Sequence, residues 1–152
     1  MRRSARAVAL ALVCLFWYPV VARADPYDAG TEEIFQAVAR IMGVNVRDEV
    51  PRPRILVGEE VDPATFARYA GFDTGGKIFS AYFSEPNLIV LREWKRHTLA
   101  HEFVHYFQVK YQGYDPLTEG DTRDTSEREA TTIQRYFDAE ERIGNGSRDS
   151  AH

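Results

Sequence analysis

The run His101-Glu102-Phe103-Val104-His105 contains the residues of this chain best suited to metal chemistry. If the run is helical, its two histidines lie four residues apart on one face, so both imidazoles can reach a single ion. Glu102 follows the first histidine directly, close enough to accept a proton from a metal-bound water molecule. The pattern therefore predicts a catalytic metal site with His101 and His105 as ligands and Glu102 as general base.

A catalytic zinc-type site usually has a third protein ligand and keeps one position for water. The two remaining histidines are poor candidates. His97 lies one turn before His101, and three ligands on successive turns would span about 12 Å, which is too far for one tetrahedral ion. His152 is the last residue of the chain. We therefore expect a carboxylate from the helix that follows the motif.

The motif resembles that of the zincin metallopeptidases, and in particular of their gluzincin branch, in which a downstream helix supplies a glutamate ligand. Several gluzincins carry this ligand in an E-x-x-A pattern, which Glu127-Arg128-Glu129-Ala130 matches. The resemblance therefore implies Glu127 as the third ligand and one Zn2+ ion per chain as the cofactor. Gln108 and Tyr111 stand where the metzincin branch has a glycine and a histidine.

Two other glutamates compete with Glu127 for the third position. Glu119 precedes a glycine, as the ligand does in other gluzincins, and Glu129 lies on the same predicted helix as Glu127. The start of that helix is also ambiguous, because Ser126 with Glu129 and Asp124 with Glu127 form overlapping capping boxes. If Ser126 caps the helix, Glu129 is used locally and Glu127 is free to bind the metal.

The resemblance implies a peptidase mechanism acting on a peptide or protein substrate. Zinc would lower the pKa of its bound water to about 7, and Glu102 would take the proton and pass it to the leaving amine. The strand before the motif helix, Asn87 to Arg92, would be the edge strand that pairs with the substrate. Asp121, Asp124 and Asp138 are available to bind the free nitrogens of the two histidines.

A second hypothesis is a non-catalytic secreted binding module with a structural or vestigial zinc site. Glu102 discriminates between the two, because a structural site needs its histidines but has no use for a glutamate between them. In the peptidase hypothesis, the short chain lacks the second subdomain that normally forms the far wall of the cleft. An unknown partner protein could complete that cleft.

Residues 1–24 have the features of a secretory signal peptide. Arg2, Arg3 and Arg6 form a basic region, Ala7 to Val21 is apolar, and Ala22-Arg23-Ala24 is an A-x-A cleavage site. We therefore expect a periplasmic or secreted protein. Cleavage would remove four arginines and the single cysteine, and would change the formal net charge from −4 to −8. Such an acidic domain is not expected to bind nucleic acid or to associate stably with a membrane.

Residues 25–152 are expected to form one α+β domain, a minimal zincin-like fold. In it, a small antiparallel or mixed sheet packs on the motif helix and a C-terminal helix. Helices are predicted over 31–42, 62–71, 94–112 and 126–143, and strands over 55–57, 77–83 and 88–91. The last two strands should form a hairpin, and Gly113 should end the motif helix. The tail from about residue 144 is expected to be disordered.

Overall fold

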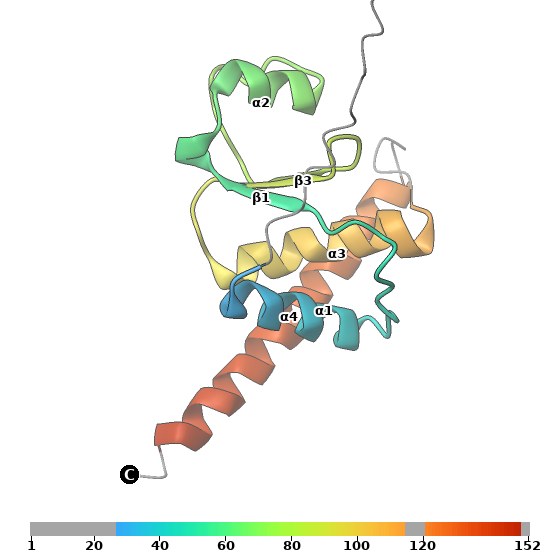
Figure 1. Cartoon of the computed structure of the whole chain (residues 1–152), viewed down its shortest axis with the longest axis vertical. Coiled ribbons are helices and arrows are strands. Elements are labelled where there is room, and N and C mark those ends of the chain that lie inside the picture. The colour runs from blue at the N-terminus through green and yellow to red at the C-terminus, as the bar shows by residue number, and fades with distance from the viewer. Residues whose placement is uncertain (1–26, 115–120, 150–152) are drawn as a thin grey trace, which may run out of the picture.

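The computed structural model describes residues 27–114 and 121–149. This part of the chain contains four α-helices and three short strands in the order α1, β1, α2, β2, β3, α3, α4 (Figure 1). Their bounds are Ala29–Ile41, Arg54–Val57, Pro63–Ala70, Ala81–Phe83, Leu88–Leu91, Arg96–Gln112 and Asp121–Asp149. A short 3-10 turn, Gly58–Glu60, follows β1. The prediction of an α+β chain with a small mixed sheet is confirmed.

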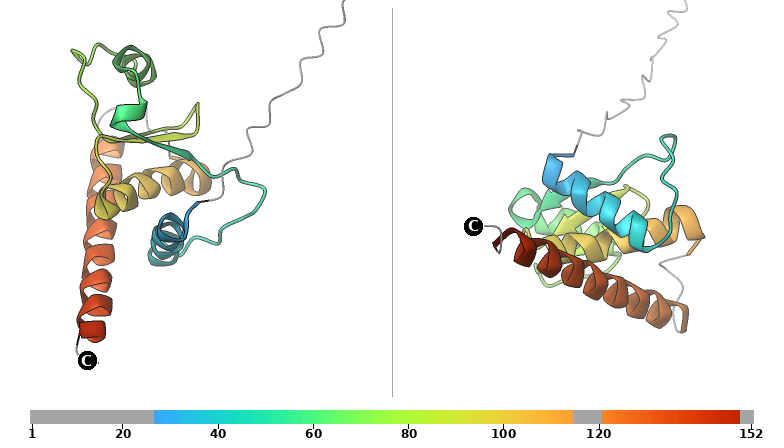
Figure 2. Two further views of the ribbon diagram at one scale, coloured as in Figure 1. Left: turned by 60° about the vertical axis from the view of Figure 1, so that its left-hand side comes forward. Right: turned by 90° about the horizontal axis from the view of Figure 1, so that it is seen from below.

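The elements form layers around the motif helix, α3. The sheet lies on one side of α3, and α2 covers the opposite face of the sheet (Figure 1). α1 packs on the other side of α3. α4 crosses α3 and also contacts α1, and its C-terminal half extends beyond the rest of the molecule (Figure 2). Because α3 is surrounded in this way, most of its middle is buried.

Strand β3 joins the two layers, because successive side chains of a strand point to opposite faces of the sheet. Ile89 and Leu91 belong to the main core with α3, whereas Leu88 and Val90 pack with Phe66 of α2. β2 and β3 form the predicted antiparallel hairpin, and β1 pairs with β3 in parallel on its other side. All four residues of β3 are accordingly buried.

The strand order β1-β3-β2 contradicts the expected role of Asn87 to Arg92. Leu88–Leu91 is the central strand of the sheet, because it pairs with both neighbours. A strand that is paired on both sides has no backbone groups left for a substrate, so the prediction of a substrate-binding edge at this position is wrong. The outer strands of the described sheet are β1 and β2. β2 is also shorter than the predicted 77–83, since only Ala81–Phe83 pair with β3.

Capping residues mark the start of α2 and the ends of α2 and α3, close to the predicted positions. The Asp62 carboxylate accepts a hydrogen bond from the Thr65 backbone N–H at 2.9 Å at the start of α2. Gly71 and Gly113 follow the last turns of α2 and α3 with φ values of 76° and 73°. These left-handed conformations strain residues that carry a Cβ atom, which explains why glycine ends both helices. α3 therefore ends at Gln112, as predicted.

The last helix, α4, is longer than predicted at both ends. It begins at Asp121, so Ser126 and Asp124 lie inside the helix and neither can be its N-cap. At the other end the backbone remains helical to Asp149, instead of fraying from Gly144. Although α4 has 29 residues, neither it nor any other described helix is apolar enough to cross a membrane.

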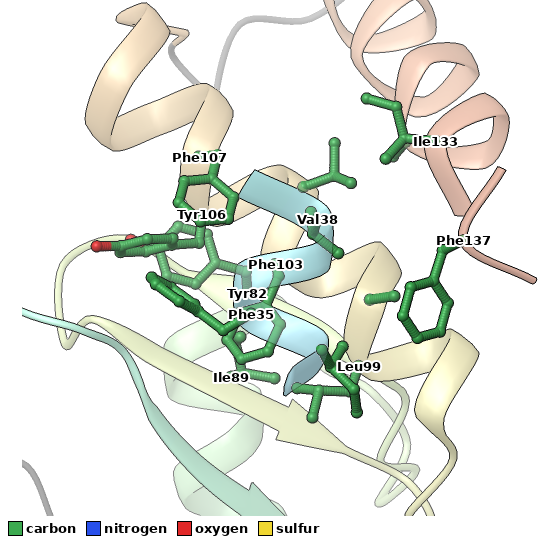
Figure 3. Close-up of a cluster of buried hydrophobic side chains, with 14 of the residues drawn as sticks. Phe35, Val38, Tyr82, Ile89, Leu99, Phe103, Tyr106, Phe107, Ile133 and Phe137 are labelled. Carbon is green, nitrogen blue, oxygen red and sulfur yellow. The ribbon is translucent and has the colours of Figure 1, made fainter. Parts of the chain in front are cut away.

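One cluster of buried side chains joins α1, the sheet, α3 and α4 (Figure 3). Its centre is aromatic, with the Phe35 ring 4.9 Å from that of Phe107 and 5.2 Å from that of Phe103, centroid to centroid. α4 contributes Ala130, Ile133 and Phe137 to the same cluster. The motif helix is thus held in place by apolar contacts on several sides, which fixes the direction of its polar face.

Phe35→Ala should lower the free energy of unfolding by about 3 kcal/mol or more, because it removes a fully buried ring and leaves a cavity. Phe72→Ala is the matched control, since this ring is 58% exposed and its loss should cost less than about 1 kcal/mol. Urea unfolding followed by circular dichroism measures both values. Equal losses in the two variants would contradict the packing of α1 on α3.

Candidate metal centre

α3 and α4 bring three potential metal ligands together. His101 and His105 lie on the side of α3 that α4 crosses, and α4 places Glu127 opposite them. Nε2 of His105 is 3.1 Å from Nε2 of His101. Oε2 of the Glu127 carboxylate lies 3.4 Å from Nε2 of His101, and Oε1 lies 3.6 Å from Nε2 of His105. Donor atoms of the two histidines and the glutamate all lie within 4.8 Å of one another.

These separations fit one small cation. With bonds of about 2.0–2.1 Å, the ligand atoms of a tetrahedral zinc site lie about 3.3–3.4 Å apart. The two imidazole Nε2 atoms are 3.1 Å apart, Oε2 of Glu127 lies 3.4 Å from Nε2 of His101, and the other oxygen, Oε1, lies 3.6 Å from Nε2 of His105. Small side-chain adjustments would therefore be enough for the three groups to bind one ion. Two imidazoles and one carboxylate are also a donor set that suits zinc.

The cluster is open to solvent on the side of Glu127. The side chain of Glu127 is 52% exposed, whereas those of His101 and His105 are 19% and 17% exposed. The histidines are thus anchored in the packed surface between α3 and α4, and the carboxylate lies at the rim. An ion bound here would keep a solvent-facing position, which a catalytic metal site requires and a closed structural site lacks.

Glutamine amides contact the far nitrogens of both histidines. Oε1 of Gln134, on α4, lies 3.1 Å from Nδ1 of His101, and Oε1 of Gln108 lies 2.9 Å from Nδ1 of His105. A carbonyl oxygen only accepts, so an Nδ1 bonded to it carries a proton and the matching Nε2 has a lone pair for an ion. The sequence suggested aspartates for this role. The sequence feature that could have identified Gln108 is its spacing, because Gln108 and His105 are three residues apart and share a helix face.

Glu102 is buried between α3 and β2. Glu102 is 4% exposed, and the backbone N–H of Tyr82 donates a hydrogen bond to its carboxylate. Burial raises the pKa of Glu102 to about 7, although the nearby His105 and the Tyr82 hydrogen bond oppose the shift. A carboxyl group that titrates near neutral pH can both accept and return a proton, as a general base must.

The charges of the three potential ligands depend on one another. The hydrogen bond with His105 lowers the pKa of Glu127 to about 2, so its carboxylate is ionised at neutral pH. Burial, followed by the neighbouring His105, lowers the pKa of His101. Burial also opposes protonation of His105, but the carboxylates of Glu127 and Glu102 outweigh it and raise the pKa of His105. A divalent ion would displace that proton when it binds.

The structure brings together the three predicted ligands, His101, His105 and Glu127. The charges of His105 and Glu127 also act on the carboxyl group of the predicted general base, Glu102. Glu129 is neither in this cluster nor a capping residue. Its Oε2 accepts a hydrogen bond from Nε2 of Gln108 at 2.8 Å. His97 is exposed on α3 and does not join the cluster. Glu119 lies outside the described residues.

No protein-family model, curated protein or solved structure compared with this chain matches it. The features of this chain that indicate a function are therefore the motif in its sequence and the geometry of this cluster.

Glu102→Gln should stabilise the metal-free protein at pH 8 but not at pH 4. The Glu102 carboxyl has a pKa of about 7 in the folded protein and an ordinary value of 4.5. The unfolded chain therefore loses this proton first, and the wild type loses stability as the pH rises from about 4.5 to 7. The expected gain at pH 8 is at most about 3 kcal/mol.

Urea unfolding at the two pH values measures this difference. Glu140→Gln is the control, because it makes the same chemical change on an exposed part of α4. It should show no comparable gain at pH 8. A Glu102→Gln variant with the same effect at both pH values would show that Glu102 does not titrate near 7.

Proposed function

We propose that this chain is an exported, zinc-dependent peptidase of the zincin type. In this proposal His101, His105 and Glu127 bind one zinc ion, and Glu102 is the general base. The observation that carries it is the spacing of the three donor groups, 3.1–3.6 Å, next to a buried carboxyl group with a pKa of about 7. Zinc bound there would supply an activated water molecule and would polarise the carbonyl group of a peptide bond.

Glu102 would carry the proton during hydrolysis. Its raised pKa lets it accept a proton from the attacking water near neutral pH and then release that proton to the leaving nitrogen. The Tyr82 N–H holds the carboxylate in place, and the α3–β2 packing shields it from solvent. The group is therefore oriented before substrate binds, which reduces the rearrangement needed for proton transfer.

Strand β2 is the best candidate for binding the peptide. It is an outer strand of the sheet, and its Tyr82 N–H bonds to Glu102, so its outer edge runs beside the proposed general base. Because that N–H is already used, a peptide would have to pair with the other outward-facing backbone groups of this edge. A peptide that paired with this edge would lie next to the cluster of ligands. Backbone pairing of this kind gives affinity that depends little on the substrate sequence. β2 thus takes the role that the sequence had suggested for Asn87 to Arg92.

A binding module with a structural zinc site explains the buried carboxyl group of Glu102 less well than a peptidase does. Structural zinc sites usually have four protein ligands, whereas the cluster in the described residues has three. A buried carboxyl group with a raised pKa also lowers stability at neutral pH, and a structural site gains nothing from it. Both features are expected of a site that activates water.

Glu102→Gln should retain zinc and lose peptide hydrolysis by about 100-fold or more, because general-base catalysis contributes about 10²–10⁴-fold. The test compares the zinc content of the purified proteins with their cleavage of a library of unstructured peptides, read by mass spectrometry. A chelator should abolish the wild-type cleavage, and added zinc should restore it.

Glu140→Gln should keep both zinc and hydrolysis, since Glu140 pairs with Arg40 on the surface. Undiminished cleavage by Glu102→Gln would contradict the role of Glu102. Absence of cleavage by zinc-loaded wild type across the library would favour the binding module instead.

A further inference from the structure

A buried amide group links His105 to a carboxylate outside the proposed ligand set. Gln108 lies one turn after His105 and is 1% exposed. Its Oε1 lies 2.9 Å from Nδ1 of His105 and accepts a hydrogen bond from Oγ of Ser126 at 2.6 Å. Its Nε2 donates to Oε2 of Glu129 at 2.8 Å and to the backbone oxygen of Ser126 at 3.1 Å. The two lone pairs and two protons of the amide all have partners.

Glu129 and the Ser126 carbonyl determine which way this amide points. Both groups only accept hydrogen bonds, so they must face the NH2 group of Gln108. The reverse orientation would place the amide oxygen against two acceptor oxygens in a buried position, leaving polar groups without partners. The carbonyl oxygen of Gln108 therefore faces His105. The proton of the neutral imidazole then lies on Nδ1, and Nε2 is left for the metal.

We propose that Gln108 and Glu129 are positioning residues of the metal centre. Glu129 fixes the amide of Gln108, which in turn fixes the tautomer and the ring orientation of His105. This inference rests on the proposed metal site. Zinc-binding histidines often donate directly to a carboxylate. Here a neutral amide stands between the imidazole and the carboxylate, so the second negative charge is kept farther from the ion.

The same helical turn of α4 supplies both a ligand and the support for another ligand. Ser126 and Glu129 flank Glu127 in sequence, and both bond to Gln108 on α3. His101 has a different arrangement, in which the amide of Gln134 on α4 faces its Nδ1. Changes at Glu129 should therefore act on the metal through His105.

Exchanging the two side chains tests this link. Glu129→Gln should weaken zinc binding about 10-fold, because a carboxylate that can only accept is replaced by an amide that can face Gln108 with either its oxygen or its NH2 group. Gln108→Leu removes the nearer acceptor for Nδ1 of His105 and leaves only the Ser126 hydroxyl, at 3.4 Å, so it should weaken zinc binding about 10- to 100-fold. The double variant Gln108→Glu with Glu129→Gln restores an acceptor against Nδ1 of His105 and a donor behind it. Its zinc affinity should exceed that of both single variants but stay below the wild-type value, because the carboxylate at position 108 has no proton to donate to the Ser126 carbonyl.

Two measurements read the outcome. Competition with a chromophoric chelator gives the zinc affinity, and 1H–15N NMR of the zinc-loaded protein shows whether Nδ1 of His105 carries a protected proton. This NMR signal should be present in the wild type and the double variant and lost in Gln108→Leu. Glu140→Gln is the control for removing a negative charge from α4, and it should leave both readouts unchanged.

Three results would overturn the inference. If Glu129 were itself a ligand, the exchange would not restore zinc binding. If the network were only structural, Gln108→Leu would keep the wild-type zinc affinity and the Nδ1 proton. A wild type that binds no zinc would refute the metal centre as well. This outcome differs from the other two because it is seen in the wild type, before any substitution is made. Should Gln108→Leu not fold, Glu129→Gln and the double variant still decide between these outcomes.

Discussion

The buried contact between α3 and α4 determines where the functional side chains lie. Ala130 is fully buried in the same cluster as Leu99 and Phe103 of α3, and its small side chain lets the two helices approach closely. Glu127 lies one turn before Ala130, so this apolar contact places the carboxylate opposite the histidines. A slip of one residue along α4 would shift Glu127 by about 1.5 Å and rotate it by about 100°. The ligand geometry therefore depends on correct apolar packing.

This packing also buries two polar side chains that a simple core would not contain. Gln108 has a partner for every polar atom of its amide, so its burial adds specificity at little cost. Glu102 differs, because burial raises its pKa to about 7 and its ionisation opposes folding. A role in proton transfer gives a reason to keep such a group. An ion that bound only the folded chain would offset part of the lost stability, because it would join α3 to α4.

The sequence predicted the features that depend on local chemistry. Asp62, Gly71 and Gly113 mark the ends of α2 and α3, because capping is decided within a few residues. The hairpin of β2 and β3 is likewise local. The clustering of His101, His105 and Glu127 followed from helical spacing and a pattern shared with a known family.

The remaining features depend on distant parts of the chain. β1 pairs with β3 across a long connection, so nothing near Leu88–Leu91 revealed that this strand is central, apart from its continuous apolar run. Ser126 looks like a helix start, yet it lies inside α4 and its hydroxyl bonds to Gln108 of α3. Tertiary contacts thus overrode a local capping signal, and they also gave Glu129 its partner.

The most direct test of the metal centre is a zinc titration of the metal-free protein, in which the wild type is compared with Glu127→Gln. The proposed metal centre should bind one zinc ion per wild-type chain and lose much of its affinity in the variant, because a charged ligand is replaced by a neutral amide. An unchanged affinity in Glu127→Gln, or the absence of zinc binding by the wild type, would contradict the proposed metal centre.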